Sequence, residues 1–163
     1  MFIKIGKEGR AAIAALSMED KRTAVTVLEA ARKNLHKQGW VQDSWGETGA
    51  GGCLNTLLLR AVGLEDNVVG GTVLAEEMFS ANPGLLRVFE TALHVEGVGR
   101  VVTAIVGFND CKSTTRAKVV AFIGGLLRYL RRAVRAEEAE LAAEVEAEQE
   151  EARLQYVYVL RQD

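Results

Sequence analysis

Five polar or aromatic residues in the sequence are candidates for contact with a ligand: Trp40, Gln42, Cys53, Asn109 and Asp110. Asn109 and Asp110 form a polar pair between apolar segments. Such a pair either binds a ligand or serves turn and capping chemistry, because short polar side chains bond nearby backbone amides. We favour capping for this pair. A small-ligand-binding or enzymatic pocket near Trp40, Cys53 and Asp110 stays open as an alternative.

The two cysteines are the candidate nucleophiles. Cysteine catalysis needs a histidine and an orienting group beside the thiol, and the only histidines, His36 and His94, fall on separate expected helices. Cys53 is more simply a small buried thiol. Cys111, beside Lys112 in a turn, is the more reactive candidate, because a nearby cation lowers the pKa of a thiol. We assign no catalytic residue and favour a protein that is not an enzyme.

The sequence gives no pattern for a metal or a nucleotide cofactor. Metal sites need clustered histidine, cysteine or carboxylate ligands, and neither histidine has a ligand partner at i+4. The segment Gly46–Cys53 (GETGAGGC) approaches a phosphate-binding loop, but Gly52 and Cys53 stand where that loop needs lysine and then serine or threonine. We interpret the segment as a surface turn, and we expect no metal and no cofactor.

A stripe of arginines is the strongest charge pattern. The residues recur at i, i+3, i+4 and i+7, which places them on one helical face: Arg128, Arg131, Arg132 and Arg135. Such a face can hold phosphates, but eight glutamates follow between Glu137 and Glu151 and would repel a nucleic-acid backbone. A solvated helix with local ion pairs is the plain interpretation.

A second copy of the chain offers a more specific interpretation of the same charges. If two such helices pair antiparallel and cross near Glu138, the arginine half of one lies beside the glutamate half of the other. A parallel pair would bring like charges together, so the charge pattern selects the antiparallel arrangement.

Helices must position all of these residues. The chain has 163 residues, enough for one domain with a sizeable core, and its single proline and abundance of Ala, Val, Leu, Glu and Arg favour helix. A net charge of −2 indicates neither disorder nor a whole-protein attraction to nucleic acid. With two cysteines, no apolar run of ~20 residues and no signal-peptide pattern, we expect a cytoplasmic protein without a membrane segment.

The expected elements follow from apolar periodicity and capping residues. Ser17 suits the cap of a helix over 18–38, Gly39 suits its end, and Asn82 before Pro83 suits the start of another. The segment 98–108 also permits a strand, but we prefer a buried helix. The expected helices are 10–16, 18–38, 53–62, 67–79, 83–94 and 98–108, followed by a long helix over about 113–152.

The long helix has two halves. From Val119 to Leu130 it is apolar nearly all round, which predicts a central core helix. Beyond Leu130 it is strongly charged and carries a thin coiled-coil-like seam spaced 7, 4 and 7, interrupted by Glu138 and Glu148. The seam residues are Val134, Leu141, Val145 and Ala152. We therefore divide the chain into a helical core domain, 1–130, and a C-terminal extension with its tail, 131–163, which serves assembly.

Both ends of the chain have strand character. Phe2–Ile5 and Tyr156–Leu160 are apolar and partly β-branched. The fold class we predict is mainly α, a compact helical bundle with a long C-terminal helix, and it leaves room for a minor two-stranded β element from the termini. A lone two-stranded sheet is marginal in water, so a partner chain would have to support it.

Several short motifs resemble an uncharacterised family of small helical proteins from actinobacteria and their phages, filed as a domain of unknown function. The matching motifs are Gly39-Trp40-x-Gln42, Cys53-Leu54 after the glycine-rich loop, and Phe108-Asn109-Asp110 with Thr115 and Val119. Members typically have cysteine, tryptophan and often arginine where this chain has Val41, Phe108 and Thr114. The resemblance covers about Ala24 to Ile123. It implies that Met1–Leu16 and the helix beyond Leu130 are additions to a shared core, and it implies no activity.

The function that we expect is a non-enzymatic binding or regulatory protein. It would act by protein–protein contact, as a homodimer through the C-terminal extension and with another protein. The interaction candidates are the four arginines of the stripe, Leu141 and Val145. The alternatives are the ligand pocket or enzyme described above and nucleic-acid binding through the Arg128–Arg135 face, which the glutamates disfavour.

Overall fold

The computed structural model describes residues 5–42, 51–64 and 71–160, and the regular elements in these ranges are all helices. They are α1 (Lys7–Ala14), α2 (Met18–Gln38), α3 (Leu54–Ala61), α4 (Gly71–Ala81), α5 (Pro83–Leu93), α6 (Val98–Asp110) and α7 (Arg116–Leu160). The predicted mainly α fold with a long C-terminal helix is confirmed. The choice of a helix over a strand for 98–108 is confirmed as well.

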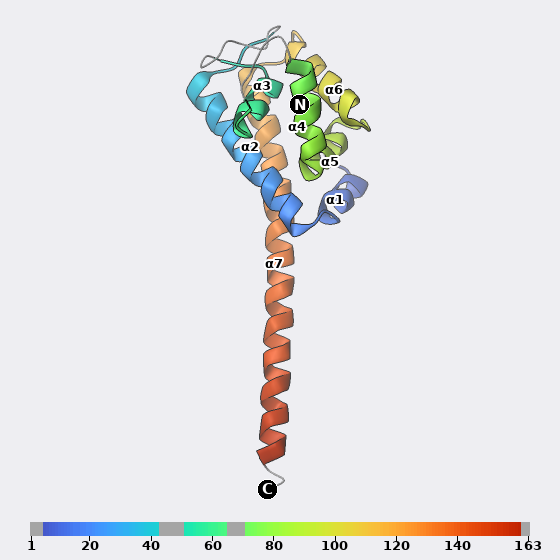
Figure 1. Cartoon of the computed structure of the whole chain (residues 1–163), viewed down its shortest axis with the longest axis vertical. Helices are drawn as coiled ribbons and strands as arrows, with labels where there is room; N and C mark the ends of the chain where they lie inside the picture. Colours follow the sequence, from blue (N-terminus) through green and yellow to red (C-terminus); the bar gives the residue numbers. More distant parts are fainter. Residues whose placement is uncertain (1–4, 43–50, 65–70, 161–163) are drawn as a thin grey trace.

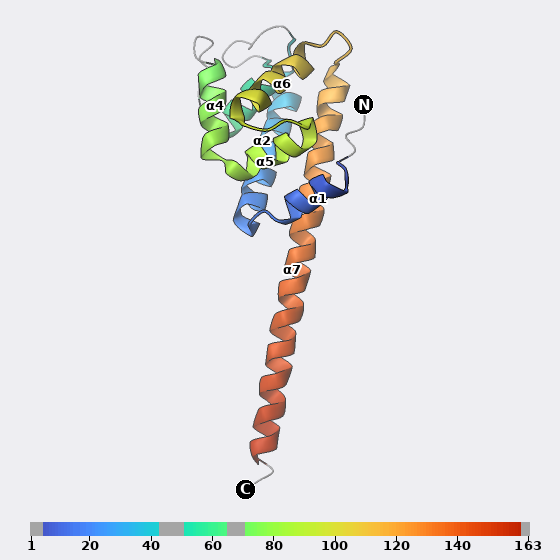
Figure 2. The same cartoon turned by 90° about the vertical axis from the view of Figure 1, so that its right-hand side faces the viewer.

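The helices form a compact bundle from which half of α7 projects. In Figure 1, α2 runs beside the upper half of α7, and α3 to α6 complete the bundle around them. Figure 2 shows α7 along one side of the bundle, with α1 crossing it near the point where it leaves the core. The lower half of α7 extends away from every other helix in both views.

The core forms around the first half of α7, as its apolar residues predict. Its side chains at Val119, Ile123, Leu126 and Leu130 are fully buried. Phe122 contacts two other aromatic rings, with centroids 5.8 Å from Phe89 and 5.0 Å from Phe108. Burial of this apolar surface is the main source of stability for the bundle.

The ends of α2 follow the predicted capping chemistry. The Oγ atom of Ser17 accepts a hydrogen bond from the backbone N–H of Asp20 at 3.0 Å, which satisfies one free amide of the first turn. At the other end, Gly39 has φ = 90°, a conformation that side chains disfavour. These two signals explain why the observed bounds of α2 equal the predicted ones.

The prediction of a strand at the C-terminal end is wrong. Residues 155–160 continue α7 as helix, and α7 ends at Leu160 instead of near residue 152. The N-terminal half of the predicted β element, Phe2–Lys4, lies outside the described residues, and Ile5 packs in the core. Most of the glycine-rich loop (46–50) and the first residues of the helix expected over 67–79 also lie outside them.

No single helix in the described ranges is both long and apolar enough to cross a membrane. By length and composition, α5 and α6 meet the requirement only as a pair, and they are bent by 55° where they join.

Candidate functional site

Four of the five sequence-predicted ligand candidates gather around Asn109 and its neighbours, at the end of the bundle away from the projecting arm. There α2 ends, α3 begins and α6 ends (Figure 1). Asn109 lies at the centre and is only 1% exposed. Its Oδ1 atom accepts from Nε1 of Trp40 at 2.7 Å and from the backbone N–H of Leu54 at 3.3 Å. Its Nδ2 group donates to the carbonyl of Val41 at 3.3 Å and to Oδ1 of Asp110 at 2.8 Å.

These four hydrogen bonds fill the capacity of the Asn109 carboxamide, which has two N–H donors and two acceptor lone pairs. Neighbouring bonds extend the connection: Nε2 of Gln42 donates to the carbonyl of Cys111 at 2.8 Å, and Trp40 forms an isolated parallel bridge with Gly52. The cluster therefore ties together three segments that are far apart in sequence. We name Trp40, Gln42, Asn109 and Asp110 the asparagine clamp.

Gly52 is required where the two chain segments meet. A Cβ atom built on Gly52 would lie 2.7 Å from the Cγ2 atom of Thr56, closer than side chains approach. A lysine, which a phosphate-binding loop needs at the same position, would therefore not fit here without a shift of Thr56. Gly52 packs against α3.

The fifth candidate, Cys53, directly precedes α3 and is 5% exposed. Its Sγ atom lies 3.4 Å from Oγ1 of Thr56, so the thiol shares a hydrogen bond inside the protein. This environment fits the expected small buried thiol.

Cys111 is exposed, and the pKa of its thiol is lowered. The first cause is a hydrogen bond with the side chain of Ser113, whose Oγ atom is 3.2 Å from Sγ; the Ser113 backbone and the positive charge of Lys118 add to it. The lowered pKa has the direction that the sequence predicts. The cation that contributes is Lys118, from the first turn of α7, instead of the adjacent Lys112.

The sequence patterns did not identify Asn55 and Lys21 as buried polar residues. Asn55, in α3, is fully buried, and neither polar atom of its side chain has a partner in the described ranges. Lys21, in α2, is 2% exposed and forms an ion pair with Glu137 of α7. Lys21 falls three residues before Ala24 on the buried face of α2, and this spacing is the signal that would have found it.

Ion pairs between α2 and α7 divide the arginine stripe. Glu29 pairs with Arg131 at 2.5 Å, and Arg22 pairs with Glu138 at 2.8 Å. Because residue numbers rise along α2 as they fall along α7, the two helices are antiparallel. Contacts with α2 thus continue to Glu138. This is eight residues beyond Leu130, the end of the predicted core domain.

The other three arginines, Arg128, Arg132 and Arg135, are exposed, and no ion pair holds them within the described ranges. Leu141 and Val145 are each 51% exposed. Arg132 and Leu141 are nine residues apart, which at about 100° per residue places them on opposite sides of α7. The interaction candidates therefore belong to two faces instead of one.

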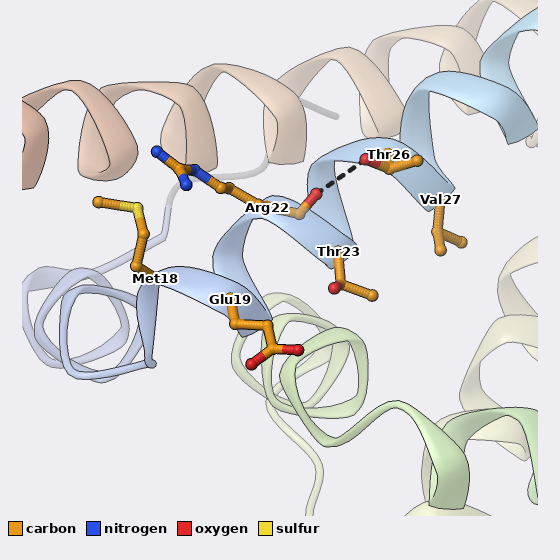
Figure 3. Close-up of a pocket in the computed structure, with 6 residues that line it drawn as sticks. All are labelled: Met18, Glu19, Arg22, Thr23, Thr26 and Val27. Carbon is orange, nitrogen blue, oxygen red and sulfur yellow. Dashed lines mark hydrogen bonds between the residues drawn. The ribbon is translucent and has the colours of Figure 1, made fainter.

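Three surface hollows lined by described residues lie apart from the asparagine clamp. Figure 3 shows one of about 540 Å³ along the first turns of α2, lined by Met18, Glu19, Arg22, Thr23, Thr26 and Val27. Another, of about 320 Å³, lies where α1 crosses α7 and is lined by Arg10, Ile13, Ala14, Tyr129, Arg132 and Ala133. Within the described ranges, no group of three His, Cys, Asp or Glu side chains is arranged to hold a metal ion.

A family model matches residues 19–128, about two thirds of the chain. The chain belongs to the family of unknown function DUF6197. The DUF6197 match begins at the second residue of α2 and ends at Arg128 within α7, so it covers the asparagine clamp and leaves out α1 and the projecting arm. No curated protein and no solved structure matches the chain.

Proposed function

We propose that this DUF6197 protein is a non-enzymatic binding or regulatory protein that works by protein–protein contact. It forms a homodimer through the second half of α7 and contacts another protein. The motifs shared with proteins of actinobacteria and their phages suggest an origin there. We name residues 139–160, beyond the last ion pair of α7 with α2, the arm.

The observation that carries the proposal is the uncovered length of the arm. About 22 residues beyond Glu138 extend ~33 Å at 1.5 Å per residue, with none of the other described helices beside them (Figures 1 and 2). Large apolar side chains on it stay 51–66% exposed: Leu141, Val145, Leu154, Tyr156 and Tyr158. Apolar surface held away from the core is typical of surfaces that bind other proteins.

The asparagine clamp supports the same proposal because it disfavours the alternative, a ligand pocket. Its carboxamide bonds join Trp40 and Val41, the start of α3 and Asp110, and the hollows along α2 and between α1 and α7 lie elsewhere. The described residues around it thus offer a ligand little that is not already engaged. We therefore prefer a contact function to the ligand pocket.

Sedimentation equilibrium on the full chain and on a truncation after Glu140 tests the proposal. The truncation keeps Glu137 and Glu138, which pair with α2, so the bundle retains its ion pairs. We expect the full chain at twice 17.7 kDa and the truncated chain as a monomer. A monomeric full chain at tens of micromolar would end the homodimer proposal, and a dimeric truncation would move the interface to the bundle.

A further inference from the structure

One face of α7 has a charge pattern that reverses about its middle. Its residues are spaced 4, 3, 4, 4, 3 and 4, so they form a single stripe at about 100° per residue. All seven are exposed: Arg128, Arg132, Arg135, Ala139, Ala143, Glu146 and Glu150. We name this stripe the reversing face. The positions are symmetrical about Ala139, with arginine at one end and glutamate at the other.

The bundle leaves this face open. Ile123 of the core and Arg132 are nine residues apart and therefore point to opposite sides of α7, and Ile123 is fully buried. The α2 helix covers the side with Glu137 and Glu138, whereas α1 meets the side with Tyr129 and Ala133. Arg132, at the edge of the reversing face, also lines the hollow between α1 and α7, but it stays exposed. A second helix can thus lie along the reversing face, beside α1, without displacing a described element.

We propose that the reversing face binds the same face of a second copy, with the two α7 helices antiparallel about Ala139. This inference rests on the proposed homodimer and names the surface that makes it. In this register Arg128 lies opposite Glu150 of the second copy, and Arg132 lies opposite its Glu146. The twofold axis repeats both, giving four ion pairs around the contact of Ala139 with its own copy, and Arg135 lies opposite the small side chain of Ala143.

The alanines make the close approach possible. Their side chains end at Cβ, so helix axes can come to the short end of the usual 8–10 Å separation, and the flanking charges then lie within reach of each other. Dimerisation breaks one local contact, because Glu150 lies 3.5 Å from Arg153 in the same helix and would pair with Arg128 of the second copy instead. Both side chains of that pair are largely exposed, so the pair contributes little to stability.

The apolar side of the arm is a poorer surface for pairing copies. Leu141 and Val145 continue the side of α7 that α2 covers, so a second helix could follow this side only beyond the end of α2. Pairing there would bring together Glu144, Glu148 and Glu151 of both copies, and like charges side by side oppose association. The free arginines would remain unpaired. This side is left for the other protein.

Two charge-reversed chains test the face. One carries Arg128→Glu and Arg132→Glu, and the other carries Glu146→Arg and Glu150→Arg. All four positions are exposed, and circular dichroism would confirm that the helices persist. Each chain alone turns the four ion pairs into like-charge contacts, so we expect the mass to fall from dimer to monomer. Mixed in equal amounts, the two chains are complementary at every position, and we expect a heterodimer.

The matched control is Glu140→Arg with Glu144→Arg, which makes the same change of net charge as Glu146→Arg with Glu150→Arg but on other sides of the arm. We expect it to remain a dimer. The face is wrong if the wild type is a dimer and the charge-reversed chains dimerise equally well alone, if the mixture stays monomeric, or if the control dissociates like the reversed chains. A monomeric wild type would instead refute the homodimer itself, so the two failures are distinguishable.

Crosslinking gives a second readout in the full chain. With Cys111→Ser to remove the exposed thiol, Ala139→Cys places one thiol beside its own copy, and a short bis-maleimide should join the two chains into a covalent dimer. Leu141→Cys is the control, because residue 141 points about 160° away from residue 139. Equal crosslinking of the two variants, or none at residue 139 in a dimeric sample, contradicts the register.

Discussion

The indole Nε1 of Trp40 donates a hydrogen bond to Oδ1 of Asn109 at 2.7 Å, across 69 residues of sequence. The same oxygen accepts from the backbone N–H of Leu54, the first residue of α3. One carboxamide thus holds Trp40, two residues after α2, and the start of α3 against the last turn of α6. All of these segments lie within the DUF6197 match.

Replacing Asn109 with alanine should destabilise the bundle. The change removes the partner of two N–H groups, and a buried donor without a partner costs about 1–3 kcal/mol. We expect the free energy of unfolding in urea to fall by about 3 kcal/mol. Trp40→Phe, which removes one of these bonds and keeps the ring, should cost about 1 kcal/mol. Equal free energies of unfolding for Asn109→Ala and the wild type would show that the clamp does not stabilise the bundle.

Replacing Asn55 with leucine should stabilise the protein. The Asn55 side chain is fully buried without a partner in the described ranges, and leucine has a similar size. Removing an unsatisfied polar group recovers its desolvation penalty of about 1–3 kcal/mol. Thermal unfolding should therefore shift upward by several degrees. A downward shift would indicate that Asn55 has a polar partner, and Asn55→Asp, which adds a buried charge, should be much less stable in either case.

Removing Glu137 alone should lower the stability of the protein more than removing both members of its ion pair with Lys21. Glu137→Ala leaves the ammonium group of Lys21 buried and uncompensated. Because the Glu137 side chain is 34% exposed, we expect about 2 kcal/mol of destabilisation, below the range of about 3–5 kcal/mol for a fully buried pair. Adding Lys21→Met should restore most of the loss in urea unfolding. A double variant less stable than Glu137→Ala contradicts this account.

Cys111 should be alkylated faster than an ordinary exposed thiol below pH 8. Its lowered pKa raises the thiolate fraction at neutral pH, and the thiolate is the nucleophile. Ser113→Ala removes the main cause, so the rise of the iodoacetamide rate with pH should move to higher pH, and Lys118→Ala should move it less. Mass spectrometry separates this reaction from that of Cys53, which is buried and should react only on unfolding. Identical pH profiles for the wild type and Ser113→Ala would remove Ser113 as the cause.

Local signals predicted most of the helices because they act over a few residues. Ser17 and Gly39 set the bounds of α2, and Pro83 set the start of α5. The end of α7 was predicted wrongly because the run of valine and tyrosine near Tyr156 has a strand preference of its own. Extending an existing helix needs no new nucleus, so α7 continues through residues whose isolated preference is different.

The sequence predicted the type of interaction in the clamp but not the partners. Short polar residues at Asn109 and Asp110 indicated capping chemistry, and in the structure the Asn109 side chain bonds the N-terminus of a helix. The sequence did not indicate that this helix is α3, 55 residues earlier, because capping rules describe neighbours along the chain. The same limit hid the Lys21–Glu137 pair, whose members are 116 residues apart.

The continuity of α7 gives it the mechanics of a lever. Neither proline nor glycine interrupts the helix after Gly125, so there is no built-in joint between the buried turns and the free end. The ion pairs at Glu137 and Glu138 attach α7 to α2 at the point where α7 leaves the bundle, and this point acts as the fulcrum of the lever. A sideways force on the distal turns is therefore transmitted to Phe122 and its aromatic neighbours instead of being absorbed by a hinge.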